Sequence, residues 1–198
     1  MMNPKQVLDV QVSKGITAAQ SNEHLRDRSE RAEKYAMTKG NYDPTRKHLN
    51  FEVVSGGKIR PVDTSRNIPE RMADILRFRG IKDPNEGLPE PKYRTVVNII
   101  FGGSRERMQE LAFGSQKVDY EKDADNSHIQ RKADIECWAK DVYSFVSGRY
   151  GEQNIAASLY IWTKSIPMYI ARFCQSRTAA LRTRRYLPER ISLNTVRE

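Results

Sequence analysis

The sequence is poor in the residues that build disulfide frameworks and metal sites. It contains only two cysteines, Cys137 and Cys174, without paired spacing, and only three histidines among 198 residues. A disulfide framework and a cysteine zinc site are therefore not expected, and the lack of a secretory signal at the N-terminus points to the cytoplasm. No apolar run approaches the roughly 20 residues that a membrane-spanning helix needs.

Length and charge indicate one domain with a polyanionic partner. A chain of 198 residues supports a single core, and its net charge of +9 with a pI near 9.6 favours nucleic acid as the partner class. The charge is uneven, because residues 157–198 hold eight basic and two acidic side chains, which leaves +3 for residues 1–156. Local clusters must therefore carry the nucleic acid prediction.

Strands and helices alternate along the chain. Strands are expected at 6–13, 48–54, 93–101 and from Asn154, where apolar and polar residues alternate or β-branched and aromatic residues dominate. Helices are expected at 17–39, from Pro69 to Gly80, from Ser104 to Gly114 and at 127–148. This order predicts an α/β fold in which helices flank an antiparallel or mixed sheet.

The regular pattern stops after about Ala157. Beyond it, large apolar side chains lie among scattered arginines with no period of two or 3.6: Trp162, Met168, Phe173 and Leu181. We therefore expect two parts, a folded part at 1–157 and an irregular, mobile basic tail at 158–198.

Three segments together carry a family resemblance: residues 41–52 (NYDPTRKHLNFE), 101–108 (FGGSRERM) and 150–156 (YGEQNIA). They are similar to the plasmid mobilization and recombination enzymes, the Mob/Pre or MobV-type relaxases, and the likeness runs across residues 3–157. The resemblance implies a relaxase-like fold. It also implies an enzyme that nicks one DNA strand at a transfer origin, stays covalently attached to its end, and needs a divalent metal such as Mg²⁺ or Mn²⁺ bound by histidines.

The resemblance further implies a strand after Ala157 reading roughly His-x-Asp-Glu-x-x-Pro-His-x-His, and this motif is missing. With permitted codons, a shift of one base converts Ser158–Gln175 into Leu-Val-His-Leu-Asp-Glu-Ile-Asn-Pro-His-Val-His-Cys-Thr-Leu-Leu-Pro. We therefore expect a frameshift near Ala157 or Ser158, a chain truncated relative to the family, and no retained metal. The histidines that are present lie on three separate segments, without the spacing of a metal-binding pair: His24, His48 and His128.

The resemblance places the chemistry on two segments. In residues 22–28 the family has a histidine followed closely by an arginine, which makes His24 the candidate nucleophile, Arg28 its catalytic partner and Arg26 a DNA contact. A basic run at the start of the second strand is expected to add DNA contacts at phosphates, sugars or bases: Arg46, Lys47, His48 and Asn50. The alternatives are a solvent-exposed histidine on a charged helix and a solvated strand start.

These features predict a plasmid mobilization and recombination protein that binds DNA at a transfer origin and has lost metal-dependent nicking. Two alternatives stay open. One is a non-catalytic DNA-binding fragment that competes at the origin, and the other is a truncated product without a function.

Overall fold

A six-stranded sheet forms the centre of the protein, whose computed structural model describes residues 7–39, 42–121, 123–163 and 168–174. The strand order is β1-β4-β6-β5-β2-β3, and every neighbouring pair is antiparallel. The strands are β1 (Val7–Ser13), β2 (Phe51–Val54), β3 (Lys58–Arg60), β4 (Val96–Gly102), β5 (Ile155–Ile161) and β6 (Met168–Cys174). The predicted α/β fold with an antiparallel sheet and flanking helices is confirmed.

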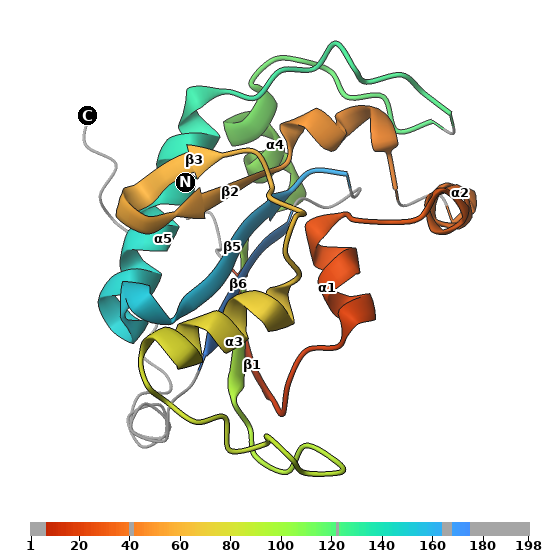
Figure 1. Ribbon diagram of the computed structural model, residues 1–198. Helices are drawn as coiled ribbons and strands as arrows, with labels where there is room; N and C mark the ends of the chain where they lie inside the picture. The colour runs from red at the N-terminus through yellow and green to blue at the C-terminus, as the bar shows by residue number, and fades with distance from the viewer. Residues whose placement is uncertain (1–6, 40–41, 122, 164–167, 175–198) are drawn as a thin grey trace.

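Helices cover both faces of this sheet (Figure 1). The α-helices are α1 (Ala18–Leu25), α2 (Glu30–Thr38), α3 (Ile68–Phe78), α4 (Arg105–Phe113) and α5 (Ala133–Tyr150), and the short 3-10 helices are η1 (Pro44–Leu49), η2 (Ser55–Gly57) and η3 (Glu152–Asn154). α1 and α3 lie on one face, and α5 lies on the other with α4 beside it. α2 buries none of its residues and stands away from the sheet. No described helix is long and apolar enough to cross a membrane.

Each face of the sheet has its own apolar core. On the α5 side, Phe51 of β2 stacks on Tyr160 of β5 with ring centroids 4.5 Å apart, and Ala139 and Val142 of α5 cover them. On the α1 and α3 side, the buried residues are Leu25, Ile68, Met72, Val96, Ala156, Ala157, Leu159 and Ile161. β5 is therefore buried on both faces.

The helix expected over residues 17–39 is two helices. α1 ends at Arg26, which adopts a left-handed conformation with φ of 57°, and α2 begins after Ser29, whose hydroxyl accepts a hydrogen bond from the Ala32 N–H. No glycine or proline marks the break, so the uniform helix-forming composition predicted one continuous helix. The break matters because it turns Arg26 inward.

Two further elements begin later than expected. The strand expected at 48–54 starts at Phe51, because the preceding residues form η1, in which the Asp43 carboxylate accepts from the Thr45 N–H. The helix expected at 127–148 starts at Ala133. β2 and β3 form a hairpin that turns at Gly56 and Gly57, both of which have positive φ.

Residues 158–161 and 168–174 belong to the sheet, so the predicted irregular tail is wrong for them. β5 continues to Ile161, and β6 fills the place between β4 and β5. Trp162 is 1% exposed and packs edge-on against Phe113, with ring centroids 5.1 Å apart. A strand that helices cover on both faces is apolar on both sides. It therefore lacks the alternation of apolar and polar residues that predicts a half-buried strand, and the sequence pattern did not indicate that β5 continues. Residues 164–167 and 175–198 of the expected tail lie outside the described residues, and the division at Ala157 stays a prediction.

Candidate functional site

The end of β5 brings both predicted segments together. Leu25, which lies between His24 and Arg26, packs in one cluster with Leu159 and Ile161 of β5. On the other side, the Trp162 N–H donates to Asn50 Oδ1 over 2.7 Å, and the Asp43 N–H donates to the Thr163 carbonyl over 2.9 Å. The end of α1 and the whole of η1 therefore flank the same strand end.

The first segment forms the Glu23 cluster, which we define as Glu23, Arg26, Arg28 and Tyr42. Arg26 Nη1 lies 2.6 Å from Glu23 Oε1, and Arg28 Nη2 bonds the other carboxylate oxygen. The Arg28 guanidinium lies over the Tyr42 ring, 4.5 Å from its centroid. The half-buried His24 is the neighbour of Glu23 in the last turn of α1.

The Glu23 cluster has more positive than negative charge. Two guanidinium groups share one carboxylate, although Arg26 is only 2% exposed. Among the described residues, Arg26 Nε and Arg28 Nη1 are buried without a hydrogen-bond partner. Burial and the nearby Arg28 charge both lower the pKa of Arg26, although Glu23 opposes them. Buried donors that lack an acceptor are costly, so the cluster is suited to a second anion.

The contacts with Arg26 and Arg28 also determine the protonation state of Glu23. Burial raises the pKa of Glu23, but the Arg26 and Arg28 guanidinium groups outweigh it and bring the value from 4.5 down to about 2. In the same cluster, burial and the hydrogen bond to Glu33 raise the pKa of Tyr42 to about 12. At neutral pH the cluster therefore holds one carboxylate, two guanidinium groups and a neutral phenol.

This depressed pKa predicts an acid-dependent stability. The stabilisation from Glu23 is complete above pH 4.5 and is lost as the pH falls through about 2, because a lowered carboxylate pKa favours the folded state only while the group is ionised. We expect Glu23→Gln to be less stable than the unsubstituted protein at neutral pH, with the difference shrinking over this range in denaturant titrations. Glu30→Gln, at an exposed ion pair on α2, is the control and should show little pH dependence. A Glu23→Gln difference that stays constant with pH would contradict the assignment.

The second segment is more buried than a DNA contact surface would be. Arg46 is 2% exposed, and its Nε donates to Asp43 Oδ2 over 2.8 Å. His48 is exposed, and its ring nitrogens lie 3.0 Å from the Thr45 carbonyl and 2.8 Å from the Ile129 carbonyl. Lys47 is exposed, and its side chain forms no hydrogen bond or ion pair with the described part of the chain. The contacts of this segment with DNA stay predictions, and Lys47 is its most accessible cation.

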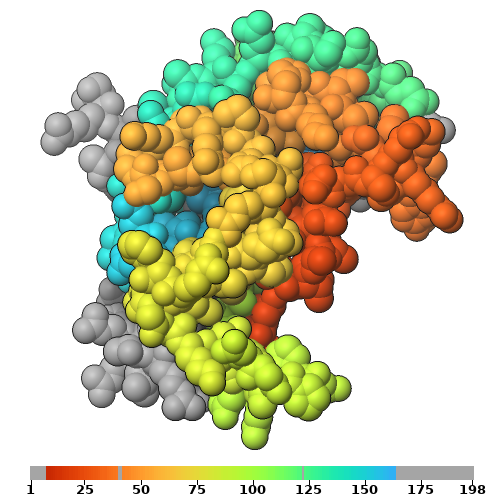
Figure 2. Space-filling model, viewed as in Figure 1, coloured from red at the N-terminus to blue at the C-terminus, as the bar shows by residue number. Residues whose placement is uncertain are grey.

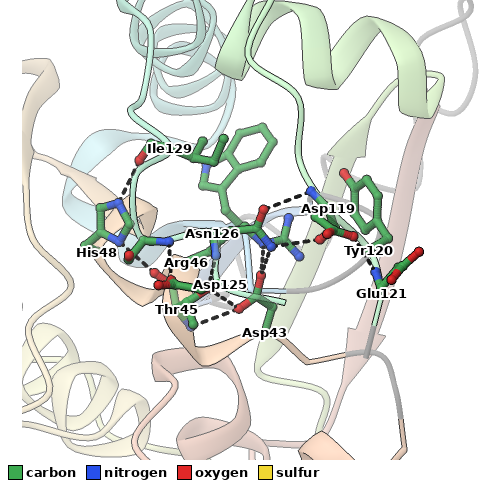
Figure 3. Close-up of polar contacts among 12 residues, drawn as sticks. Asp43, Thr45, Arg46, His48, Asp119, Tyr120, Glu121, Asp125, Asn126 and Ile129 are labelled. Carbon is green, nitrogen blue, oxygen red and sulfur yellow. Dashed lines mark hydrogen bonds and ion pairs between the residues drawn. The ribbon is translucent and has the colours of Figure 1, made fainter. Parts of the chain in front are cut away.

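A buried asparagine that sequence reasoning missed holds η1 against the loop at 115–132. Asn126 is 1% exposed, and its amide donates to Asp43 Oδ2 and to the Asp119 carbonyl and accepts from the Asp119 N–H, as Figure 3 shows. Its backbone N–H donates to Thr45 Oγ1 over 2.9 Å. The hydrogen bonds from Asn126 and Thr45, together with Arg46, outweigh burial and lower the pKa of Asp43. We call Asp43, Thr45, Asp119 and Asn126 the Asn126 junction.

A separate cleft of about 650 Å³ lies between the β2–β3 hairpin, α3 and β5, and Figure 2 shows the hollow. Its charged lining holds three arginines and four carboxylates. Three of these carboxylates are paired with the arginines: Glu52 with Arg60 and Arg71, Asp63 with Arg60, and Asp74 with Arg66. Glu52 is 1% exposed and receives both arginines, so this cleft lacks the charge excess found in the Glu23 cluster. None of the predicted site residues lines it.

The residues at the end of β5 do not fit a divalent metal ion. Glu23 is already bound by two guanidinium groups, the last residues of the strand are Tyr160 and Ile161, and Trp162 follows them. β6 reads Met-Tyr-Ile-Ala-Arg-Phe-Cys and contains no histidine or carboxylate. Among the described residues, no group of three or more histidine, cysteine, aspartate or glutamate side chains could hold a metal. Divalent cations prefer carboxylate and imidazole ligands over this set.

Comparison with known proteins gives one kind of match. No protein family profile matches the chain, and no curated protein sequence does. Among solved structures, crystal structures of the MobM relaxase domain (MOBV; Mob_Pre), bound to Mn and to plasmid pMV158 oriT DNA, are similar to it. One has a TM-score of 0.54 at 14% identity and covers 98% of this chain and 93% of that chain. A second, whose DNA carries a 3′ thiophosphate, has a TM-score of 0.51 at 15% identity over 98% and 93%. At this identity the likeness shows a shared fold: the chain is folded like the MobM relaxase domain.

Proposed function

We propose that this protein binds single-stranded DNA at the transfer origin of a mobilizable plasmid, and that it does so without metal-dependent nicking. The observation that carries the proposal is the positive excess of the Glu23 cluster at the end of β5. Two buried guanidinium groups there have donors free for an anion, and a phosphodiester supplies the acceptor oxygens that they lack.

The fold supports the same conclusion. The structures that share it are relaxase domains bound to origin DNA, and their alignment covers nearly all of this chain. In this chain His24 lies in the last turn of α1, close in sequence to Arg26 and Arg28, while the end of β5 offers apolar side chains. The plasmid mobilization role and the loss of nicking rest together on these two features.

The first test distinguishes two neighbouring cations of η1: Lys47, the proposed DNA contact, and Arg46, which is expected to stabilise the fold. Lys47→Ala should weaken binding of single-stranded origin DNA and reduce the slope of log K against log salt by about 0.7, because one exposed cation no longer displaces a counterion. Fluorescence anisotropy over about 50 to 200 mM salt measures this slope. Lys140→Ala is the matched control, since Lys140 is an exposed lysine on α5 and not on η1.

Arg46→Ala should behave differently from Lys47→Ala. Because Arg46 is buried and paired with Asp43, its removal leaves a partly buried carboxylate without its cation, and we expect a loss of folding stability of about 2 kcal/mol. Thermal unfolding followed by circular dichroism measures this effect. If Lys47→Ala left the salt slope unchanged while Lys140→Ala lowered it, the DNA would lie on the α5 face and this site would be wrong.

Arg28→Gln tests the Glu23 cluster itself. Arg28 Nη1 is one of the two free donors, and glutamine keeps a polar side chain while removing the charge. We expect DNA binding at least about tenfold weaker, which corresponds to the loss of one charge-assisted contact. Unchanged affinity in a variant that remains folded would remove the cluster from the binding site.

A further inference from the structure

A row of guanidinium groups and tyrosines continues from the Glu23 cluster to the start of α4. Arg28 lies over Tyr42, the neighbouring Asp43 holds Arg46, and the Arg46 guanidinium lies 5.4 Å from the centroid of the Tyr120 ring. At the far end, the Arg105 guanidinium lies 4.2 Å from the same centroid. We call Arg46, Tyr120 and Arg105 the Tyr120 stack. It differs from the Glu23 cluster because its outer members are accessible.

The exposure and the existing bonds of these side chains decide which of them can bind a ligand. Tyr42 is 8% exposed and donates to Glu33, and Arg46 is 2% exposed and donates to Asp43, so both are internal supports. Tyr120 is 41% exposed, and Arg105 is exposed at the first turn of α4. The Arg105 guanidinium lies over the Tyr120 ring, so a stacked pair of flat groups is presented to solvent, and nucleic acid bases stack on groups of both kinds.

The backbone around Tyr120 is held rigidly although its ring is exposed. The Asn126 side chain binds both the N–H and the carbonyl of Asp119, and the Glu121 N–H donates to Asp119 Oδ1 over 2.8 Å, as Figure 3 shows. Gln109 of α4 donates to the Tyr120 hydroxyl. An exposed aromatic that is fixed by a buried network loses little conformational entropy when it binds a ligand.

The charges next to the ring are balanced, so they do not select a phosphate. Asp119 and Glu121 flank Tyr120 in the chain and offset the guanidinium groups of Arg46 and Arg105. A base has no charge and can use both the ring and the Arg105 guanidinium. This distinguishes the Tyr120 stack from the Glu23 cluster, where buried donors without an acceptor suit a phosphate.

We infer that the Tyr120 stack is a base-stacking position for the single-stranded DNA whose backbone binds at the Glu23 cluster. The inference rests on the proposed function and adds a second contact of a different kind. Phosphates are bound at the end of β5, and one unpaired base stacks on Tyr120 and Arg105 beyond Arg46. Contacts of this kind tolerate any base, because every base has an aromatic face.

The test uses the full chain and two labelled oligonucleotides, an oligothymidine and an abasic strand of the same length. Tyr120→Ala should weaken oligothymidine binding by about 5- to 100-fold without changing the salt slope, whereas Tyr120→Phe should bind nearly as the unsubstituted protein does. Binding of the abasic strand should be the same for all three. Tyr93→Ala is the matched control, because Tyr93 is 39% exposed and lies in the loop between α3 and β4, away from α4 (Figure 1).

Two further measurements make the result independent of folding changes. Arg105→Lys keeps the charge and removes the planar group, so we expect weaker oligothymidine binding with an unchanged salt slope. Photocrosslinking of an oligonucleotide that contains 5-iodouracil should attach it to Tyr120 in the unsubstituted protein. Equal losses on the abasic strand, or a crosslink that maps elsewhere while binding persists, would overturn the stacking position and leave the proposed function intact. If the unsubstituted protein bound neither oligonucleotide, both the stacking position and the proposed function would be contradicted.

Discussion

Supercoiled plasmid carrying the cognate origin should remain supercoiled when the purified protein is added with Mn²⁺ or Mg²⁺. A metal ion contributes several kcal/mol of charge stabilisation to phosphodiester cleavage, so its loss slows the reaction by at least about a thousandfold. The sequence supplies no substitute ligands, because its three histidines lie in α1, in η1 and in the loop before α5, and β6 has neither histidine nor carboxylate. Agarose gel electrophoresis of the plasmid measures the nicked product.

The control is a gene in which one base restores the alternative reading after Ala157. That variant carries histidines and a paired Asp-Glu at the end of β5 and in β6, so we expect metal-dependent nicking to appear. His24→Ala in the restored variant should abolish it again if His24 is the nucleophile. Metal-stimulated nicking by the present 198-residue chain, or a restored variant that stays inactive while binding origin DNA, would contradict the frameshift account.

Asn126→Ala should cause the largest loss of stability among the polar substitutions. Its amide forms three hydrogen bonds inside the Asn126 junction, and alanine leaves buried partners on Asp43 and Asp119 without them. We expect the free energy of unfolding to fall by about 3 kcal/mol, and the melting temperature by roughly 6 to 12 °C. Chemical and thermal denaturation followed by circular dichroism measure both values.

Asn85→Ala is the matched control for Asn126→Ala. The Asn85 amide also bridges backbone groups, those of Lys14, Lys92 and Tyr93, but it is only partly buried. Water can replace the lost bonds there, so we expect about 1 kcal/mol. If the two variants lost equal stability, burial would not be the source of the Asn126 effect. If Asn126→Ala were neutral, the junction would not hold the loop at 115–132 in place.

Short-range patterns predicted most of the elements, and the failures have local physical causes. Caps and glycine stops located α3 and α4, where Asn67 and Ser104 cap the helix starts and Gly114 follows the last turn. The break between α1 and α2 was missed because Arg26 enters the left-handed region without a glycine, and the attraction of Glu23 across one turn holds it there. The continuation of β5 beyond Ala157 was missed because a strand buried on both faces has no polar side to reveal its period.

The candidate site was predicted by resemblance and completed by long-range contacts. His24, Arg26 and Arg28 belong to one short segment, so a motif could indicate them. Tyr42, Tyr120 and Asn126 reach the site through the fold, from parts of the chain far apart in sequence, and no local pattern marks an aromatic ring that a distant arginine will cover. One local signal was available, because Tyr120 lies between Asp119 and a polar, acidic stretch at residues 121–125, where an aromatic side chain is unusual.

The position of β6 gives the protein an unusual order of assembly. The strands β1 to β5 all precede β6 in the chain. In the sheet, however, β1 and β4 are joined to β5, β2 and β3 only through β6, the last of the described strands. During synthesis the earlier strands therefore form two separate ribbons with unpaired edges facing each other, and such edges are prone to pair with other chains. The sheet closes from its middle only when β6 has been made, so the strand that joins the two ribbons is the last of the described strands to emerge.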